Sequence, residues 1–421
     1  MAQDPDDIRQ ARWRFCCMAG AYSLGVYNDN FFKQVALILA VAAGQNSMQG
    51  FAVAVFTLPF LVFAAPAGWA ADRFPKRKVV LAAKWTELVA MLAGAAGICT
   101  GSWPLLFTML AVMGVQATFF SPALNGSIPE LYPESYVPRA NAVLRMLVTV
   151  AILGGVALAG VVLDRPGQWA GIERGRWLVG FMVVGIAFLG LLVSFGVPNR
   201  PAANPLAPYP WNGPIHTLGQ LRRVQGDGLL LLSVVADVLL WSIGSLGVLL
   251  LNPLGMQEFG LGKSLTSALV ACQLVGIGAG GFAGGRLLSG PLWYRRIPAG
   301  FLLMSACLGA MPLVPLLEGA AGVPVLFTLT ALLGAAGGLL LIPVESFLQV
   351  RPPAQEKGAV WSAVNFAVFS GIFLSGFVAN WLNARFRPTD AMGWVGVATL
   401  VAAGGLWWMG RFREAKTGRS L

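Results

Sequence analysis

Asp29 and Lys33 are the residues whose types and spacing most directly suggest chemistry. They belong to the motif Asn28-Asp29-Asn30-Phe31-Phe32-Lys33, which lies within an apolar run from about Trp13 to Ala43. Residues four positions apart share one face of a helix. A charge at the middle of a membrane-spanning helix costs at least ~2.5 kcal/mol and usually faces a bundle interior or a water-filled cavity. The motif therefore favours a functional polar site, and the alternative is a self-neutralised pair that holds neighbouring helices together.

A second pair of opposite charges, Lys84 and Glu87, lies three residues apart in a later apolar stretch. This spacing permits an ion pair on one helix face. Arg145 is a further charge inside an apolar stretch. Because a buried charge must be paired, Arg145 is either part of a polar site or the partner of Glu87 or another buried acid.

Two acids, Asp237 and Glu345, lie in apolar stretches of the second half of the chain. A proton-coupled antiporter uses such carboxylates to exchange a proton for its substrate, and Asp237 is a candidate for that coupling. The alternatives are pairing with Arg286 or Lys357, or a position near water at a helix end.

The composition indicates which elements carry these residues. Hydrophobic residues make up 57% of the chain and charged residues 11%, against roughly 25% charged residues in a soluble domain. Apolar stretches of about the 20 residues that a bilayer requires recur along the chain. We count twelve, centred near Asn28, Val62, Val89, Val112, Ala151, Ile186, Leu240, Val275, Met304, Leu333, Ile372 and Ala402. The sequence thus predicts an all-α membrane protein with twelve transmembrane helices and excludes a soluble globular fold.

The formal charge of +11 is distributed unevenly between alternate loops. With a cytoplasmic N-terminus, most of the 29 lysines and arginines fall on the cytoplasmic side. That is the positive-inside pattern, and it predicts that both termini are cytoplasmic. A basic chain could instead bind nucleic acid. Here the charges are scattered over short loops between spans, so topology explains them better.

The longest polar interval, residues 198–228, is rich in proline and contains the only histidine, His216. It separates six predicted helices in residues 1–197 from six in residues 229–421. Two six-helix bundles joined by a linker are the layout of a two-bundle transporter. A lone histidine in such a linker is expected to be solvated rather than catalytic.

Other patterns argue against enzymatic or metal chemistry. The five cysteines lie inside apolar segments without a CxxC pair, so neither a disulfide framework nor a metal site is expected. The GxGxxG match at Gly276–Gly281 lacks the preceding strand that a dinucleotide site requires. Two pairs of glycines instead have the small-xxx-small spacing of closely packed helices, Gly280 with Gly284 and Gly281 with Gly285. With no HxxxxD or GxSxG motif present, we expect no enzyme activity, no cofactor and no nucleic-acid partner.

One loop carries a more specific pattern. The segment Gly68-Trp69-Ala70-Ala71-Asp72-Arg73-Phe74-Pro75-Lys76-Arg77-Lys78 follows the second apolar stretch. It resembles the G-x-x-x-D-R-x-x-R/K-R/K loop of the major facilitator superfamily, which lies between helices two and three on the cytoplasmic side. The resemblance implies that Gly68, Asp72, Arg73 and Arg77 form a latch that holds one conformation and is released as the two bundles rock. The alternative is a plain cluster of topology-setting charges.

Further motifs narrow this resemblance. They are, in chain order, Phe120–Leu131, Arg139–Ala142, Ile342–Gln349, Lys357–Gly358 and Asn365–Phe366. Together with the first-helix motif they resemble the lysophospholipid transporter (LplT) branch of the superfamily, over nearly all the spans. That branch also occurs fused ahead of acyltransferase domains.

The resemblance implies that a lysophospholipid, typically lysophosphatidylethanolamine, is moved from the outer to the inner leaflet of a bacterial inner membrane, where a separate acyltransferase reacylates it. In this interpretation Asp29 holds the headgroup ammonium, and Lys33 or Arg145 meets the phosphate. Charge-assisted contacts of this kind are strong in a cavity of low dielectric constant. Further polar candidates for the headgroup site are Asn28, Asn30, Asn125, Glu345 and Asn365. For the asparagines the alternative role is a hydrogen bond between neighbouring helices.

Two positions depart from the pattern of the branch. Leu124 stands where a lysine is usual, and Arg145 stands close to where an acid is usual. Arg145 either restores the lost positive charge from a facing helix, gripping phosphate with two hydrogen bonds, or marks a different substrate. A proton-driven drug efflux pump or a metabolite carrier is therefore the nearest alternative function. A non-transporting receptor or scaffold on the same fold is an alternative from another class.

Overall fold

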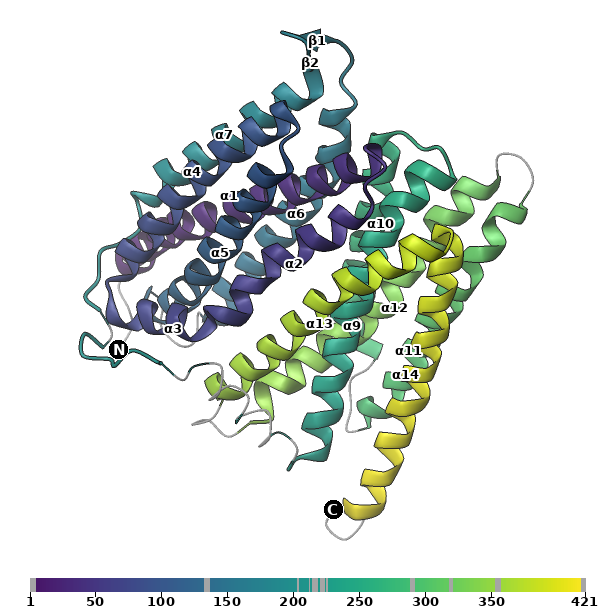
Figure 1. Ribbon diagram of the computed structural model, residues 1–421. Coiled ribbons are helices and arrows are strands. Elements are labelled where there is room, and N and C mark those ends of the chain that lie inside the picture. The colour runs from purple at the N-terminus through teal and green to yellow at the C-terminus, as the bar shows by residue number, and fades with distance from the viewer. Residues whose placement is uncertain are drawn as a thin grey trace. The chain divides into compact units, whose positions relative to one another are not determined.

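The computed structural model describes residues 5–131, 137–202, 204–211, 213, 219, 224, 226–287, 292–317, 321–352 and 357–417. These residues form long helices and one short hairpin (Figure 1). The chain divides into two compact units. Unit 1 comprises Met1–Ala36 and Val55–Pro214, and unit 2 comprises Leu37–Ala54 and Ile215–Leu421. His216, which we expect to be solvated, lies outside the described residues.

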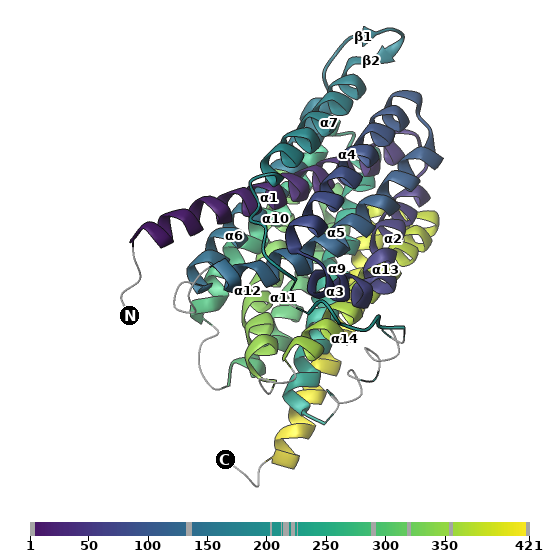
Figure 2. The ribbon, with the colours of Figure 1, turned by 90° about the vertical axis from the view of Figure 1, so that its left-hand side faces the viewer.

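The first half of the chain is mostly helical, and its helices are of spanning length except α2 and α3, which are shorter. The helices are α1 (Pro5–Ala42), α2 (Ser47–Val62), α3 (Ala64–Arg73), α4 (Lys76–Thr100), α5 (Trp103–Leu131), α6 (Val137–Leu163) and α7 (Arg174–Ser194). An antiparallel hairpin of β1 (Gln168–Trp169) and β2 (Ile172–Glu173) joins α6 to α7. The hairpin stands clear of the helix ends of its unit in both views (Figures 1 and 2).

The second half of the chain repeats this helical architecture. Its elements are α9 (Gly228–Pro253), a π-helical turn (Leu254–Glu258), α10 (Lys263–Leu287), a 3-10 turn (Trp293–Arg296), α11 (Ile297–Ala310), a second 3-10 turn (Met311–Leu316), α12 (Gly322–Val350), α13 (Lys357–Arg385) and α14 (Pro388–Thr417).

Side-chain amides attach the end of α1 and the start of α2 to unit 2. Asn46 and Gln257 exchange two amide hydrogen bonds, at 2.8 and 3.0 Å. The buried amide of Asn252 donates to Gln49 Oε1 at 3.2 Å. Residues 37–54 therefore belong structurally with the second half of the chain, although their helices begin or end in unit 1.

The predicted membrane architecture is confirmed. Within the described residues, 10 helices are long and apolar enough to cross a bilayer, and the bent pair α2–α3 adds one more. α1 is not among them because the polar Asn28–Gln34 stretch lowers its hydropathy, yet its 38 residues exceed the length of a span. Counting α1 as a crossing gives the twelve spans that we predict from the sequence.

The break between α2 and α3 has a local cause. The two helices meet at 53°, and Phe63 between them lies outside the helical region at φ −105°, ψ 6°. Pro66 follows in the first turn of α3 and has no backbone N–H to donate, so the helix cannot continue uninterrupted through this point. Asp72, which the sequence places in a loop, therefore lies in α3, and α4 begins at Lys76 shortly after α3 ends at Arg73.

Small residues bring α10 and α12 into backbone contact. A side chain at Gly276, Gly280 or Gly284 would collide with the α12 backbone at Ala331, Ala335 or Leu339. The predicted close packing at Gly280 and Gly284 is confirmed, whereas Gly285 has open space around it. This contact is the most extensive between two helices in the described part of the chain.

Candidate functional site

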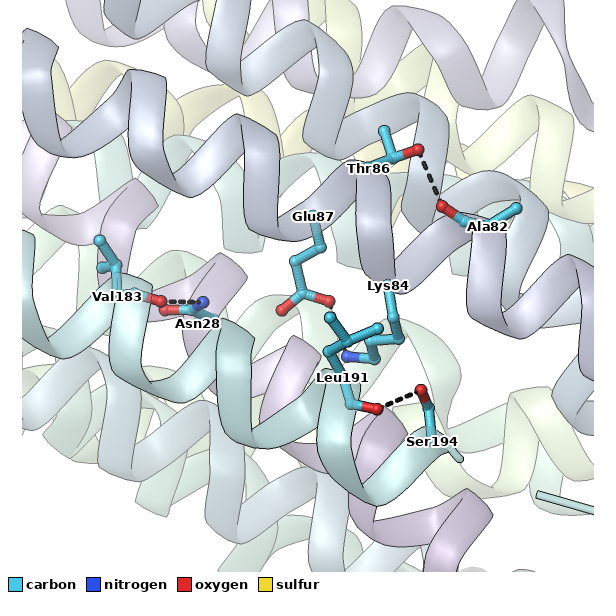
Figure 3. Close-up of polar contacts among 8 residues, drawn as sticks. All are labelled: Asn28, Ala82, Lys84, Thr86, Glu87, Val183, Leu191 and Ser194. Carbon is cyan, nitrogen blue, oxygen red and sulfur yellow. Dashed lines mark hydrogen bonds and ion pairs between the residues drawn. The ribbon is translucent and has the colours of Figure 1, made fainter. Parts of the chain in front are cut away.

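Asn28 faces the interior of unit 1. Its side chain is fully buried, and its amide nitrogen donates to the Val183 carbonyl oxygen of α7 at 2.9 Å (Figure 3). Its amide oxygen, Asn28 Oδ1, has no hydrogen-bond partner within the described part of the chain. Asn30, by contrast, binds its own helix by donating to the Val26 carbonyl at 2.8 Å. The two asparagines that flank Asp29 thus have different roles, one between helices and one within α1.

Asp29 and Lys33 are both half-buried on α1. The charged groups that act most strongly on Asp29 are Glu87, Lys84 and Lys33. Lys33 Nζ lies 5.3 Å from the centre of the Phe56 ring, a cation–π distance. Asp29 Oδ1 is buried and has no hydrogen-bond partner among the described residues. A buried carboxylate oxygen without a donor is costly, so this atom is open to a cationic or hydrogen-donating ligand.

Lys84 and Glu87 form the predicted ion pair. Their side chains are 1% and 0% exposed, and Lys84 Nζ lies 2.6 Å from Glu87 Oε2. Both extend from α4 towards α7 (Figure 3). Space for them comes from Gly25 on α1 and Gly190 on α7, where a side chain would meet Lys84 Nζ at 2.8 and 3.2 Å.

An aromatic face completes the surroundings of this pair. Lys84 Nζ lies 5.4 Å from the centre of the Phe120 ring, and Phe120 stacks on Tyr22 of α1. Glu87 Oε1 has no hydrogen-bond partner in the described residues. We call Asn28, Asp29, Lys84 and Glu87 the polar cluster of unit 1.

The sequence motif alone does not reveal this cluster. It associates Asp29 with Lys33, whereas the structure adds Glu87 and Lys84 as electrostatic neighbours from another helix. Gly25 is a position in the sequence that does indicate the cluster. It lies four residues before Asp29 and therefore on the same helix face, where a glycine leaves room for side chains of another helix. Ser23, whose buried hydroxyl has no partner among the described residues, has no comparable signal.

The positions that depart from the family pattern lie elsewhere. Leu124 is 1% exposed and belongs to an apolar cluster with Phe15, Phe120 and Leu144. Arg145 is exposed on α6. Glu87 is paired with Lys84, so it does not require Arg145 as its counter-ion. Asn125 lies in α5, outside the residues whose side chains the structure describes.

The predicted latch loop contacts the first part of the linker, all within unit 1. The backbone N–H of Asn204 donates to the Asp72 carbonyl at 2.9 Å. Trp69 Nε1 and Arg73 Nη1 both donate to the Ala207 carbonyl, at 3.0 and 3.4 Å. We call residues 204–211 the linker strap.

Two further residues of the predicted latch flank this contact. Arg77 Nη2 donates to the Phe195 carbonyl at 3.1 Å, which ties the start of α4 to the end of α7. No atom lies close to the place where a side chain at Gly68 would begin. Packing around this position therefore does not require a glycine. The role of the loop as a latch stays a prediction.

In unit 2 the structure brings two predicted acids together. Asp237 on α9 is 2% exposed and lies close enough to Glu345 on α12 for their charges to interact. Asp237 Oδ1 is buried and has no hydrogen-bond partner among the described residues. Asn365 is half-buried on α13, and the side chain of Lys357 lies outside those described. Two nearby carboxylates are an arrangement in which one proton is easily held.

The described residues contain no group of three or more histidine, cysteine or acidic side chains that could hold a metal ion. The polar cluster of unit 1 offers two carboxylates, one amide and one ammonium group, and Lys33 adds a second ammonium group nearby. These suit the recognition of a small charged or zwitterionic group by hydrogen bonds and ion pairs.

Comparison with known proteins gives one family. The model of the Major Facilitator Superfamily matches residues 16–376. Among curated proteins, the chain is 29% identical to the lysophospholipid transporter LplT of Pectobacterium carotovorum subsp. carotovorum, over 79% of this chain and 77% of that protein. It is also 29% identical to LplT of Escherichia coli O1:K1 / APEC, over 79% of each chain.

Solved structures share the fold. A POT family transporter in complex with a thioalcohol-conjugated peptide superposes with a TM-score of 0.72 at 13% identity, over 94% of this chain and 96% of that one. A bacterial homologue of the lysosomal transporter Spinster, in an inward-facing and unoccupied conformation, gives 0.70 at 14% identity, over 97% of both chains. At such low identity the likeness concerns the fold alone.

Proposed function

Because the chain belongs to the major facilitator superfamily of membrane transporters, we propose that it moves a lysophospholipid across a membrane by alternating access, without a chemical step. The similarity to LplT over most of both chains supports the substrate class. The observation that carries the proposal is Asp29: a half-buried carboxylate in a spanning helix with an oxygen that lacks a donor in the described residues.

The chemistry of a lysophospholipid headgroup matches the charges of α1. The free Asp29 oxygen accepts from the headgroup ammonium, and Lys33, one turn away, meets the phosphate. Phe56 covers Lys33 and limits its hydration, which strengthens an ion pair with phosphate. Asn30 contributes its amide oxygen from the same helix. Arg145, exposed on α6, is the second candidate for the phosphate, and it replaces the lysine that this chain lacks at Leu124.

The direction of movement follows from where the lipid is used. We place the protein in a bacterial inner membrane with both termini in the cytoplasm, as the charge distribution predicts. The lysolipid enters from the outer leaflet and is delivered to the inner leaflet, where a separate acyltransferase consumes it. The protein itself is not an enzyme in this proposal, and it needs no cofactor.

A second function is favoured by one observation in unit 2. The buried Asp237 lies beside Glu345, and such an acid pair suits a carrier that exchanges a proton for its substrate. In that case a drug or small metabolite is moved at the expense of the proton gradient. The two functions differ in whether transport needs Asp237 and a proton gradient.

A reconstituted transport assay separates these functions. Liposomes containing the purified protein receive labelled lysophosphatidylethanolamine in one leaflet, and the fraction accessible to albumin is followed with and without a protonophore. We expect lysolipid movement that survives loss of the proton gradient and the Asp237→Asn substitution. Movement that stops in both conditions would establish the proton-coupled function instead. Retained lysolipid binding without any movement would indicate a receptor.

A further inference from the structure

A groove of about 360 Å³ lies on unit 1, away from the polar cluster. α3 and α4 both pack on α5 but hardly touch each other, so a channel remains between them with α5 as its floor. Ala70 on α3 and Ala82 on α4 line the channel, and their side chains are too small to fill it. Figure 3 shows Thr86, another lining residue, pointing away from Lys84 and Glu87 on the opposite side of α4.

The groove has the length and polarity of an acyl-chain site. Its lining runs along α4 from Lys78 to Thr86, a helical distance of about 12 Å. One leaflet of a bilayer has a hydrocarbon depth of about 15 Å. The walls and floor include Phe74, Val115 and Phe119. A cavity near the lower end of the ~300–1,000 Å³ range of ligand pockets suits one chain rather than a whole lipid.

The basic residues at the open end of the groove favour an anionic lipid headgroup. Lys78 is exposed in the first turn of α4 and lines the groove. Lys76 and Arg77 precede it, so three consecutive basic residues stand at the point where α4 enters the membrane. A cluster of this kind at a membrane surface attracts anionic lipids, with about 1 kcal/mol per basic residue.

We propose that this groove binds one acyl chain of an anionic two-chain phospholipid from the leaflet that faces the α3–α4 loop, with the lipid phosphate on Lys78. The bound lipid fills the space between α3 and α4 and thereby braces α3, the helix that carries Asp72. It is distinct from the proposed substrate, since it lies on the opposite side of α4 from the polar cluster.

Native mass spectrometry tests this site directly. Purified protein is titrated with phosphatidylglycerol, phosphatidylcholine or lysophosphatidylethanolamine, and bound lipid is counted after graded removal of detergent. Lys78→Gln removes the headgroup contact, and Ala82→Trp fills the groove. The matched controls are Arg200→Gln, an exposed charge of unit 1, and Ala96→Trp, an exposed alanine on the same helix.

We expect wild-type protein to retain phosphatidylglycerol over phosphatidylcholine, and Lys78→Gln to weaken that retention about fivefold, the factor for one basic residue near an anionic surface. Ala82→Trp abolishes it, and both controls behave as wild type. Equal retention by all variants, or a preference for lysophosphatidylethanolamine at this site, would overturn the proposal. The readout is binding, so it stands apart from the outcome of the lysolipid transport assay.

Discussion

Lys84 and Glu87 are joined by a 2.6 Å ion pair that is buried completely inside unit 1. The pair lies between α1 and α7, in the space that Gly25 and Gly190 leave, and its charges reach Asp29. Two of the three charged groups that act on the first-helix carboxylate therefore lie on α4. Asp29 is one acid of a cluster rather than half of a local pair with Lys33.

Breaking this ion pair should destabilise the protein strongly. Glu87→Gln leaves the Lys84 ammonium buried without its counter-charge, and a loss of ~3–5 kcal/mol is expected. Replacing both residues, as Lys84→Met with Glu87→Leu, should recover most of the loss because no charge is then buried. Thermal unfolding in detergent measures both effects.

An exposed pair of the same spacing provides the control for that experiment. Glu173 and Arg176 approach to 3.2 Å with both side chains exposed to solvent by 30% or more. Glu173→Gln should change stability by at most ~1 kcal/mol. If Glu87→Gln were as mild as this control, the buried pair would not be an important support of unit 1.

The contact between α10 and α12 should depend on individual glycines. Gly280→Ala places a methyl group against the Ala335 backbone of α12, and overpacking of this kind costs ~1–3 kcal/mol. Gly278 lies two residues away on the same helix with open space around it. Gly278→Ala should be neutral or stabilise the helix by up to ~1 kcal/mol. Equal melting temperatures for the two variants would contradict the packing described for α10 and α12.

Acid should weaken unit 2 through Asp227, which lies just before α9. Burial alone would raise the pKa of this carboxyl, but the Arg351 side chain and the N–H groups of Leu230 and Leu229 donate to it and hold its pKa below the usual value. A lowered folded-state pKa stabilises the fold above the unfolded value of ~3.9, and this contribution is lost as the pH falls through the folded value.

The measurement compares Asp227→Asn with wild type between pH 7 and pH 3. Asparagine still caps the helix but has no charge for Arg351, so the variant should be less stable by about 1 kcal/mol at neutral pH. That difference should shrink below about pH 4 and vanish when the wild-type carboxyl is protonated. A difference that stayed constant over the whole range would show that the ion pair contributes nothing.

The linker strap should be released by loss of one hydrogen bond. Trp69→Phe removes the indole N–H that donates to the Ala207 carbonyl while keeping an aromatic ring against Tyr209. One hydrogen bond contributes about 1 kcal/mol, so chymotrypsin should cut the strap after Trp211 about fivefold faster. Trp85→Phe, at an exposed position on α4, is the control. Unchanged cleavage in Trp69→Phe would mean that the strap is held by other contacts.

Much of the fold was accessible from the sequence. Apolar stretches of spanning length predicted an all-α membrane protein, because composition and length alone decide whether a helix can cross a bilayer. The Lys84–Glu87 pair was also accessible, since both residues lie on one helix face at a spacing that admits contact. The glycine contact at Gly280 follows from spacing in the same way.

The remaining features depend on contacts between distant segments. The approach of Glu87 to Asp29, the meeting of Asp237 with Glu345, and the linker strap all join residues far apart in the chain. A single sequence has no periodicity that reports such pairings. The bend at Phe63 is intermediate, because Pro66 marks a break but does not determine its angle.

The role of Asp29 is tested most directly by lysolipid movement in proteoliposomes with Asp29→Asn, which keeps the shape of the side chain and removes its charge. Losing a charge-assisted hydrogen bond of ~1.5–3 kcal/mol should slow the movement of lysophosphatidylethanolamine at least about tenfold, with an unchanged melting temperature. Asp390→Asn, at an exposed acid of α14, should move the lipid at the wild-type rate. Wild-type movement by a correctly folded Asp29→Asn variant would contradict the proposed headgroup site.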